Sequence, residues 1–209
     1  MSYLKEMAEQ GYNSDTIGAF HRVMMPYLAR RLGIGKADAI IDIGAGQGHG
    51  LIPLKNAGYG NLHALDIDPM NFELFKTRFG IEGHVCDANR DRFPFADDQI
   101  AFAYSAHVIE HLDQPGHFLS EIYRVLKPGA HVALVTPDWR KQFKTFYRDP
   151  THIRPYDKVS IGRLLRMHGF RDVETSSWNA RFGLGRLQAY RWFPKAGMIG
   201  EDMIAFAVK

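Results

Sequence analysis

Apolar residues recur along the chain at two spacings, which predict strands alternating with helices. Short runs of consecutive apolar residues, typical of strands buried on both faces, occupy five segments. These runs are 39–43, 61–66, 84–86, 100–105 and 131–136. Longer segments carry apolar residues three or four positions apart, and this spacing predicts helices with one apolar face. The predicted helices are 16–32, 48–56, 69–79, 115–126 and 157–168.

This alternation predicts a parallel sheet that is covered by helices on both faces. Two further strands are predicted at 171–177 and 202–208. No internal repeat, biased segment or linker interrupts the pattern, so we expect residues 1–209 to form a single domain. In such a sheet, ligands bind beyond the carboxyl ends of the strands, at the point where the strand order reverses.

A cluster of glycines directly follows the first predicted strand, at Gly44, Gly46, Gly48 and Gly50. This pattern predicts a strand that breaks into a tight turn and then a helix. Glycine accepts positive φ, and its missing Cβ lets a ligand lie against the backbone. The free N–H groups and the dipole of the following helix would point at that ligand. A small-molecule site is therefore favoured over a merely tight connection between strand and helix.

The spacing of these glycines differs from the dinucleotide fingerprint G-x-G-x-x-G. Counted from Gly44, the third glycine should fall at His49, and counted from Gly46 it should fall at Leu51. That third glycine permits close packing of helix and strand under a pyrophosphate. Its absence counts against a nicotinamide-dependent oxidoreductase.

A carboxylate ends the second predicted strand, at Asp66. It lies ~20 residues beyond Gly44, where an acid can accept hydrogen bonds from two ribose hydroxyls at the edge of the neighbouring strand. The alternative is that Asp66 caps the helix that begins near Pro69. Asp68 suits that capping role better, so we expect Asp66 to bind a ligand.

Six motifs in this order resemble those of class I S-adenosylmethionine-dependent methyltransferases, in particular the small-molecule type with a methyltransferase type 11-like domain. The motifs are 42–48, 65–69, 86–88, 93–97, 107–112 and 124–130. The resemblance implies a doubly wound, mostly parallel, seven-stranded Rossmann-like sheet that ends in an antiparallel hairpin. It also implies an enzyme that uses S-adenosyl-L-methionine and releases S-adenosyl-L-homocysteine.

The resemblance assigns cofactor contacts to residues in the first three motifs and at the end of the fourth strand. These are Asp42, Gly44, Ala45, Gly46, Gly48, Asp66, Ile67, Asp87, Ala88 and Ser105. In the family, the counterparts of Asp87 and Ala88 contact the adenine edge. A carboxylate there accepts from an exocyclic amine, and a backbone amide donates to a ring nitrogen. An ordinary turn aspartate is the alternative for Asp87.

Three segments outside these motifs are expected to lie over the substrate. They are an N-terminal helical cap at 1–35 and two aromatic and basic inserts at 137–156 and 178–200. Arg154 can hold a carboxylate or phosphate of the acceptor, since a guanidinium binds such groups with two hydrogen bonds. The candidate substrate-binding residues are Arg154, Tyr156 and Tyr12, with Tyr3 as a further lid residue.

Histidine is the expected base, because its pKa near neutrality lets it take a proton from a hydroxyl or phenol nucleophile. The candidate catalytic residues are His111, His152 and His107. The segment 107–111 also matches H-x-x-E-H, the spacing of some zinc peptidases, and His117 is the nearest third ligand. Similar H/E/H-L sequences are common in methyltransferases without metal, so we expect no metal.

Bulk properties narrow the function classes. Of the 209 residues, 45% are hydrophobic and 23% charged, which is ordinary for a globular protein. No apolar run approaches the ~20 residues of a membrane helix, and the N-terminal residues lack the apolar core of a secretory signal. Cys86 is the only cysteine, which agrees with a reducing cytoplasm. The net charge of +3 is too small to argue for nucleic acid.

We therefore expect a cytoplasmic enzyme that methylates an oxygen or nitrogen atom of a small-molecule acceptor, without a membrane partner. A homodimer is compatible with the sequence. An RNA or protein methyltransferase is the main alternative, because basic residues of 140–148 lie among aromatic ones and could bind RNA by stacking and charge. No Asn-Pro-Pro-Tyr-like motif follows the fourth strand, which counts against methylation of base amines.

Overall fold

The computed structural model describes residues 14–177 and 202–209. Its centre is one seven-stranded sheet in the order β3-β2-β1-β4-β5-β7-β6. The strands are β1 (Ile40–Ile43), β2 (Leu62–Asp66), β3 (Glu82–Val85), β4 (Ile100–Ala106), β5 (Leu126–Pro137), β6 (Arg171–Ser177) and β7 (Asp202–Val208). Strands β1 to β5 pair in parallel, and β7 pairs antiparallel with both β5 and β6. The expected sheet with a terminal antiparallel hairpin is confirmed.

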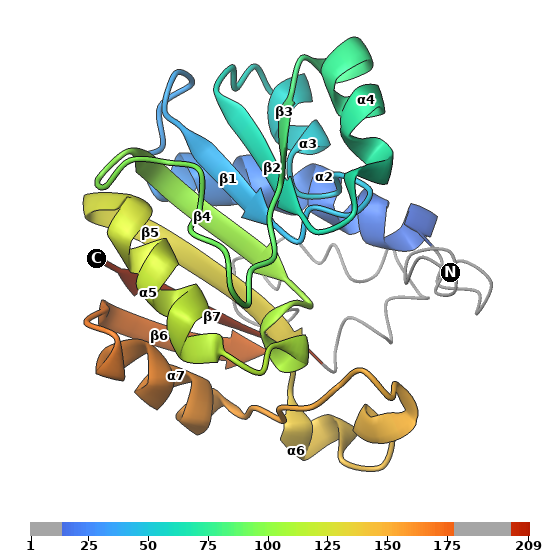
Figure 1. Cartoon of the computed structure of the whole chain (residues 1–209), viewed down its shortest axis with the longest axis vertical. Coiled ribbons are helices and arrows are strands. Elements are labelled where there is room, and N and C mark those ends of the chain that lie inside the picture. The colour runs from blue at the N-terminus through green and yellow to red at the C-terminus, as the bar shows by residue number, and fades with distance from the viewer. Residues whose placement is uncertain (1–13, 178–201) are drawn as a thin grey trace.

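Helices cover both faces of this sheet, as the alternating pattern predicts (Figure 1). On one face, α2 (Ser14–Arg31), α3 (Ile52–Asn56) and the π-helical turn η2 (Phe75–Phe79) pack with residues such as Ile40 and Phe102. On the other face, α5 (Pro115–Val125) and α7 (Lys158–Met167) pack with Ile41 and Ala103. Successive strand residues thus enter opposite cores, which requires apolar residues throughout each central strand.

Two predicted helices and two strands differ from the expected bounds, and the larger strand difference is in β5, which begins at Leu126 and not at the predicted residue 131. The helix after the glycines begins only at Ile52, because Gly48 has a φ of +77° that a helix cannot contain. Segment 69–79 forms η1 (Pro69–Asn71), α4 (Phe72–Leu74) and η2 instead of one α-helix. Strand β3 begins two residues before the predicted 84–86. The spacing of apolar residues does not distinguish these hydrogen-bonding patterns.

The start and end of α7 are as predicted. The Asp157 carboxylate accepts hydrogen bonds from the N–H groups of Val159 and Ser160, and the Ser160 hydroxyl accepts from the Asp157 N–H. This capping box satisfies N–H groups that the first turn leaves unpaired. Gly169, with a φ of +89°, ends the helix in the left-handed conformation that glycine adopts readily.

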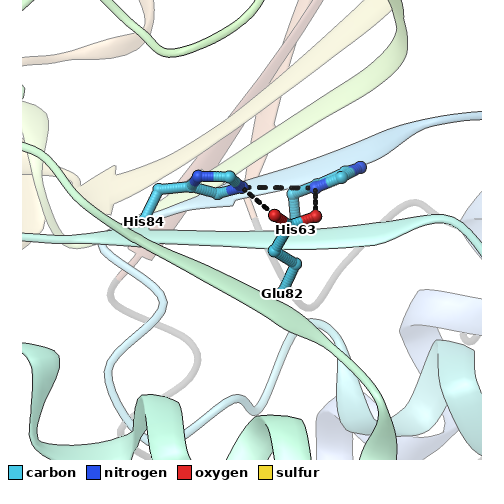
Figure 2. Close-up of side chains that lie close together, drawn as sticks. All are labelled: His63, Glu82 and His84. Atoms are coloured by element: carbon cyan, nitrogen blue, oxygen red, sulfur yellow. Dashed lines mark hydrogen bonds and ion pairs between the residues drawn. The ribbon is translucent and has the colours of Figure 1, made fainter.

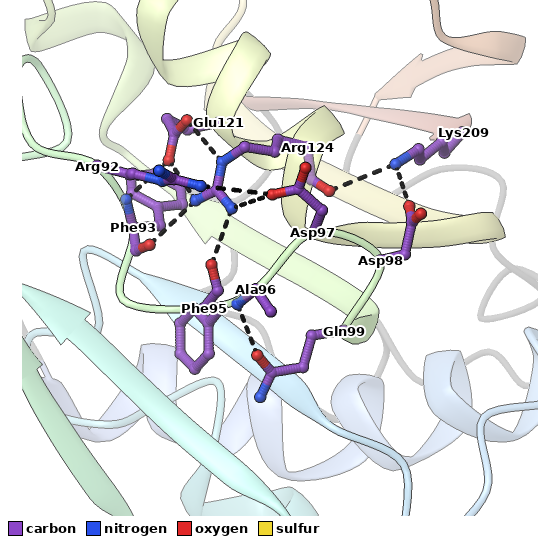
Figure 3. Close-up of polar contacts among 10 residues, drawn as sticks. All are labelled: Arg92, Phe93, Phe95, Ala96, Asp97, Asp98, Gln99, Glu121, Arg124 and Lys209. Atoms are coloured by element: carbon purple, nitrogen blue, oxygen red, sulfur yellow. Dashed lines mark hydrogen bonds and ion pairs between the residues drawn. The ribbon is translucent and has the colours of Figure 1, made fainter.

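Arg124 of α5 holds the loop between β3 and β4 against the helix (Figure 3). Its guanidinium donates to the carbonyls of Phe93 and Phe95 at 3.0 and 2.8 Å, and to the carboxylates of Asp97 and Glu121. These contacts raise the pKa of Arg124, chiefly through Glu121. The motifs 93–97 and 124–130 therefore meet in the fold, and their contact fixes the position of Phe95.

No helix among residues 14–177 and 202–209 combines the length and apolar character that crossing a membrane requires.

Candidate active site

The strand order reverses between β1 and β4, since β2 and β3 lie on one side of β1 and β5 lies beyond β4. The glycine loop after β1 occupies this switch point, where open α/β sheets bind their ligands. Gly44, Gly46 and Gly48 have φ values of +74°, +49° and +77°, so the expected positive φ is confirmed. A side chain at Gly44 would overlap Val108, which follows β4. The glycines thus let the loop lie close to its neighbours.

The N–H groups of this loop are used inside the protein. Gly44 and Ala45 donate to the Leu65 carbonyl at 2.8 and 3.1 Å, and Gly48 donates to the Ala45 carbonyl at 2.7 Å. The N–H groups of Gly44, Ala45 and Gly48 are therefore not the free groups that the sequence led us to expect at the start of a helix. The helix α3 itself begins only at Ile52.

Asp66 closes the loop from the end of β2. Its Oδ2 accepts from the Gly46 N–H at 2.8 Å, and its Oδ1 accepts from the Asp68 N–H at 2.9 Å. The Asn71 side chain donates to the Gly46 carbonyl at 2.8 Å and holds the same turn from the other side. Asp68, as expected, is the residue that caps η1, by accepting from the Met70 N–H. The structure therefore brings together Gly46 and Asp66, which the sequence assigned to one ligand.

Asp42 is buried at the base of the loop. Burial, with a further contribution from the charge of Asp66, raises the pKa of Asp42 to about 8. A Cβ on Gly50 would overlap the Asp42 carboxylate and lie 3.0 Å from the Tyr104 ring, so the fourth glycine makes room for both side chains. Asp42 is therefore mostly protonated near pH 7 in the ligand-free protein, and a positive charge bound beside it would favour its ionised form.

The remaining predicted cofactor residues occupy different surroundings. The Asp87 carboxylate accepts from the Asn89 N–H at 2.9 Å, which is the turn role named as its alternative. Ala88 is half-buried in the same turn, and Ile67 is exposed beside Asp66. Ser105 is buried and its hydroxyl donates to the Ile43 carbonyl at 2.8 Å, so it joins β4 to β1.

His107 lies between two carboxylates at the end of β4. Its Nδ1 is 3.3 Å from Glu110 Oε1, and its Nε2 is 3.4 Å from Asp202 Oδ2 of β7. Burial lowers the pKa of His107, but the two carboxylates outweigh it and raise the pKa well above its ordinary value. His107 is therefore protonated near neutral pH and is poorly suited to take a proton.

Glu110 is fully buried and is held from both sides. The Thr136 hydroxyl donates to Glu110 Oε2 at 3.0 Å, opposite the ion pair with His107. Burial alone would raise the pKa of Glu110, but His107 and the charge of His111 lower it below its ordinary value. The Glu110 carbonyl also accepts from the N–H groups of Ile153 and Arg154. Segment 137–156 is thus fastened directly to the loop that follows β4.

His111 and His152, which are 41 positions apart in the sequence, face each other with ring centroids 4.8 Å apart. The Thr151 hydroxyl donates to Asp149 at 2.6 Å, so both Thr151 oxygens accept from His111 Nδ1, at 2.9 and 3.1 Å. The His111 proton therefore resides on Nδ1 and the lone pair on Nε2. Burial, with the charge of His152, lowers the pKa of His111 despite the opposing charge of Glu110. His111 is neutral near pH 7, as a base must be.

His152 is oriented by its own segment, 137–156. Its Nδ1 donates to the Phe146 carbonyl at 2.8 Å, and the Phe146 ring lies 4.6 Å from the imidazole. Segment 137–156 forms the short helices α6 (Trp139–Gln142) and η4 (Phe146–Arg148), which extend beyond the carboxyl end of β5 (Figure 1). Trp139 and Tyr147 pack edge-on against Phe146. The aromatic residues of this insert therefore build a small core that supports the histidine.

The metal-ligand set that the structure brings together differs from the one suggested by H-x-x-E-H. Ligand atoms of Glu110, His111 and His152 lie within 4.8 Å of one another. His117, the third ligand suggested by sequence, donates to the Asp91 carbonyl at 2.9 Å. His107 is paired with carboxylates. The sequence suggested His107, His111 and His117 as metal ligands. Among the described residues, only His111 of these three belongs to a group of three possible ligands.

Arg154 and Tyr156 lie beside this histidine pair. The Arg154 guanidinium donates to the carbonyls of Leu112 and Asp113, both at 2.9 Å, and so braces the loop after β4. Burial raises the pKa of Tyr156 to about 12, and its hydroxyl has no hydrogen-bond partner within 14–177 and 202–209. Both side chains line a hollow of about 560 Å³ that Arg140, Arg163 and apolar residues of α7 complete. Tyr12 and the insert 178–200 lie outside the described residues.

Sequence reasoning missed three residues next to the glycine loop. His21 of α2 contacts the Tyr104 hydroxyl through Nε2 at 2.9 Å, and its ring stacks on His49 with centroids 6.0 Å apart. His21, His49 and Tyr104 come from three separate segments of the sequence, and no motif connects them. Asp202 was missed for the same reason, because only the antiparallel pairing of β7 brings it to His107.

Comparisons with known proteins agree with this geometry. Residues 15–175 match the family model described as a methyltransferase domain. An uncharacterized methyltransferase of Mycobacterium tuberculosis (strain H37Rv) is 26% identical over 159 residues, which cover 76% of this chain and 61% of the relative. A malonyl-[acyl-carrier protein] O-methyltransferase of Marinomonas sp. is 27% identical over 143 residues, 65% of this chain and 53% of the relative. The chain thus spans 53–61% of the length of these relatives.

Solved structures share the fold. A SAM dependent methyltransferase from Archaeoglobus fulgidus has a TM-score of 0.70 at 19% identity, with 100% of both chains covered. A Haloferax volcanii putative methyltransferase, solved in complex with the activator Trm112, has a TM-score of 0.75 at 18% identity and covers 100% of this chain and 98% of that one. At these identities the likeness shows the fold alone.

Proposed function

Since the chain belongs to the methyltransferase domain family and has the fold of class I S-adenosylmethionine-dependent methyltransferases, we propose that it methylates an oxygen or nitrogen atom of a small molecule. S-adenosylmethionine, when bound, supplies an electrophilic methyl group on a sulfonium. The protein must then hold the acceptor in line with that methyl group, and such positioning can account for ~7–11 kcal/mol of the barrier.

The acidic surroundings of the glycine loop carry this proposal. S-adenosylmethionine has a positive ammonium and a positive sulfonium, which suit a loop closed by the Asp66 carboxylate and would favour the ionised form of the buried Asp42. A pyrophosphate would instead meet the Asp66 carboxylate and keep Asp42 protonated, and the N–H groups of Gly44, Ala45 and Gly46 already donate within the protein. We assign the ribose to Asp66 and the adenine to the turn at Asp87 and Ala88.

His111 is the base that we propose for a hydroxyl acceptor. Its lone pair is on Nε2, its pKa is lowered, and Thr151 fixes its ring. His152 positions His111 through ring contact and is itself held by Phe146. His107 does not take part in proton transfer, because its carboxylate partners keep it protonated. A base of this kind typically contributes 10²–10⁴-fold to a rate.

The acceptor is assigned to the neighbourhood of segment 137–156. The buried hydroxyl of Tyr156 can pair with a polar group of the acceptor, since no described residue satisfies it. Three arginines line the adjoining hollow, Arg140, Arg154 and Arg163, against one carboxylate, Asp157, which pairs with Arg140 at 2.7 Å. The remaining positive charge favours an acceptor with a carboxylate or phosphate. The Marinomonas relative is an O-methyltransferase by name, which supports an oxygen acceptor here.

Calorimetric titration tests the cofactor assignment. S-adenosylhomocysteine is expected to bind the purified chain, and NADH is not. Asp66→Asn should weaken binding by at least about tenfold, because a charged acceptor is worth ~1.5–3 kcal/mol. Asp68→Asn is the matched control, since asparagine caps a helix as well as aspartate does. NADH binding without S-adenosylhomocysteine binding would overturn the proposal.

A further inference from the structure

A second cluster of ligand-type side chains lies at the edge of the sheet, one to three residues before the carboxyl ends of β2 and β3. It consists of His63 on β2 and of Glu82 and His84 on β3 (Figure 2). The register pairs His63 with Glu82 and Leu65 with His84, so the three side chains share one face of the sheet. His63 precedes Asp66 by three residues, which is ~10 Å along a strand.

The distances within this cluster match those between the ligands of a tetrahedral zinc ion. His63 Nδ1 is 3.4 Å from His84 Nε2 and 3.5 Å from Glu82 Oε2. His84 Nε2 is 4.0 Å from Glu82 Oε1. Zinc–nitrogen bonds of ~2.0–2.1 Å at tetrahedral angles place neighbouring ligand atoms roughly 3.4 Å apart. Glu82, whose side chain is 67% exposed, is free of packing that would prevent it from closing the remaining half-ångström.

The tautomer of His63 presents a lone pair to the cluster. Asn61 donates through Nδ2 to the Ala37 carbonyl, which turns its Oδ1 toward His63. That oxygen lies 2.8 Å from His63 Nε2 and therefore accepts its proton. Nδ1 is left as an acceptor facing a carboxylate and a second imidazole. Histidines that bind metals are oriented by a hydrogen bond of this kind on the opposite nitrogen.

The rings are held in place before any ion arrives. Phe95 packs edge-on against His63 and His84, with ring centroids 5.2 and 5.3 Å apart. The backbone of Phe95 is itself fixed by Arg124 (Figure 3).

We propose that His63, Glu82 and His84 bind a zinc ion that clamps the edge strand β3 to β2. Two imidazoles, one carboxylate and an open fourth position form a donor set that suits zinc. Strand β3 is at the edge of the sheet, and only four residues pair it to β2. A cross-strand ion would hold β3, and with it the turn at 86–88. The site is separate from the cluster of Glu110, His111 and His152.

A zinc titration in a variant that lacks the other cluster tests this proposal. Full-length His111→Ala protein, stripped of metal, is expected to bind one equivalent of Zn²⁺ by calorimetry. At zinc a hundredfold above its dissociation constant, the midpoint of thermal unfolding should rise by about 5–10 °C. Adding His84→Ala to this variant should abolish both effects.

Glu82→Gln in the same background is the variant that leaves folding intact, because the side chain is exposed. It should weaken zinc binding by about tenfold or more, since even changes to the surrounding shell of a metal site cost 10–100-fold. The proposal is overturned if His111→Ala protein binds no zinc. It is equally overturned if His84→Ala and Glu82→Gln leave the affinity unchanged.

Discussion

Asp42→Asn should remove a large part of the pH dependence of folding stability. The folded protein keeps a proton on Asp42 up to a pKa of about 8, whereas the unfolded chain releases it near the ordinary aspartate pKa of 3.8. Between these values the folded state binds more protons, so stability is full below pH ~4 and falls as pH rises toward 8. The slope is about 1.4 kcal/mol per pH unit, or roughly 4 kcal/mol from pH 5 to pH 8 as an upper bound.

Urea unfolding of the wild type and Asp42→Asn at pH 5, 6, 7 and 8, without ligand, measures this effect. Burying an asparagine adds a cost of about 1–3 kcal/mol that does not vary with pH, so the slope and not the absolute stability is compared. The free energy of unfolding of Asp42→Asn, relative to that of the wild type, should rise steadily as the pH rises. Asp113→Asn, at an exposed site, is the control and should follow the wild type. Parallel pH profiles for the wild type and Asp42→Asn would refute the reasoning.

Four further variants probe the carboxyl edge and the loop that supports it. His111→Ala or His152→Ala should lower turnover well over tenfold and leave S-adenosylhomocysteine affinity nearly intact in calorimetry; wild-type rates in both would remove histidine from the mechanism. His107→Ala should cost about 3–5 kcal/mol in urea unfolding at pH 7, because Glu110 would stay buried without its partner, and a loss under ~1 kcal/mol would contradict this. Arg124→Met should cost about 2–4 kcal/mol in the same assay, since carbonyls of the 93–97 loop lose charged donors; an unchanged midpoint would count against that role.

The strands and the glycine loop could be predicted because their signals are local. A run such as 100–104 is apolar at every position, and only a strand covered on both faces satisfies that pattern. The turn after β1 requires positive φ, and glycine is the residue that adopts it freely. The capping box of α7 is also local, since Asp157 and Ser160 are three residues apart.

The irregular helices and the distant contacts could not be predicted. The segment 69–79 has apolar residues at 72, 75 and 79, which suit an α-helix and a π-helical turn equally. His107 is paired with Asp202, and His111 with His152, only because β7 and the 137–156 insert return to the end of β4. The edge cluster escaped notice because His63 and His84 belong to different strands, whose register no local pattern reveals.

The crystal structure of the chain with S-adenosylhomocysteine tests the central claim most directly. We predict that the nucleoside lies at the switch point between β1 and β4, with its ribose hydroxyls on the Asp66 carboxylate and its amino acid end toward the Gly44–Gly46 turn. A nucleoside found elsewhere on the molecule, or a switch point filled by protein side chains in the complex, would contradict the account.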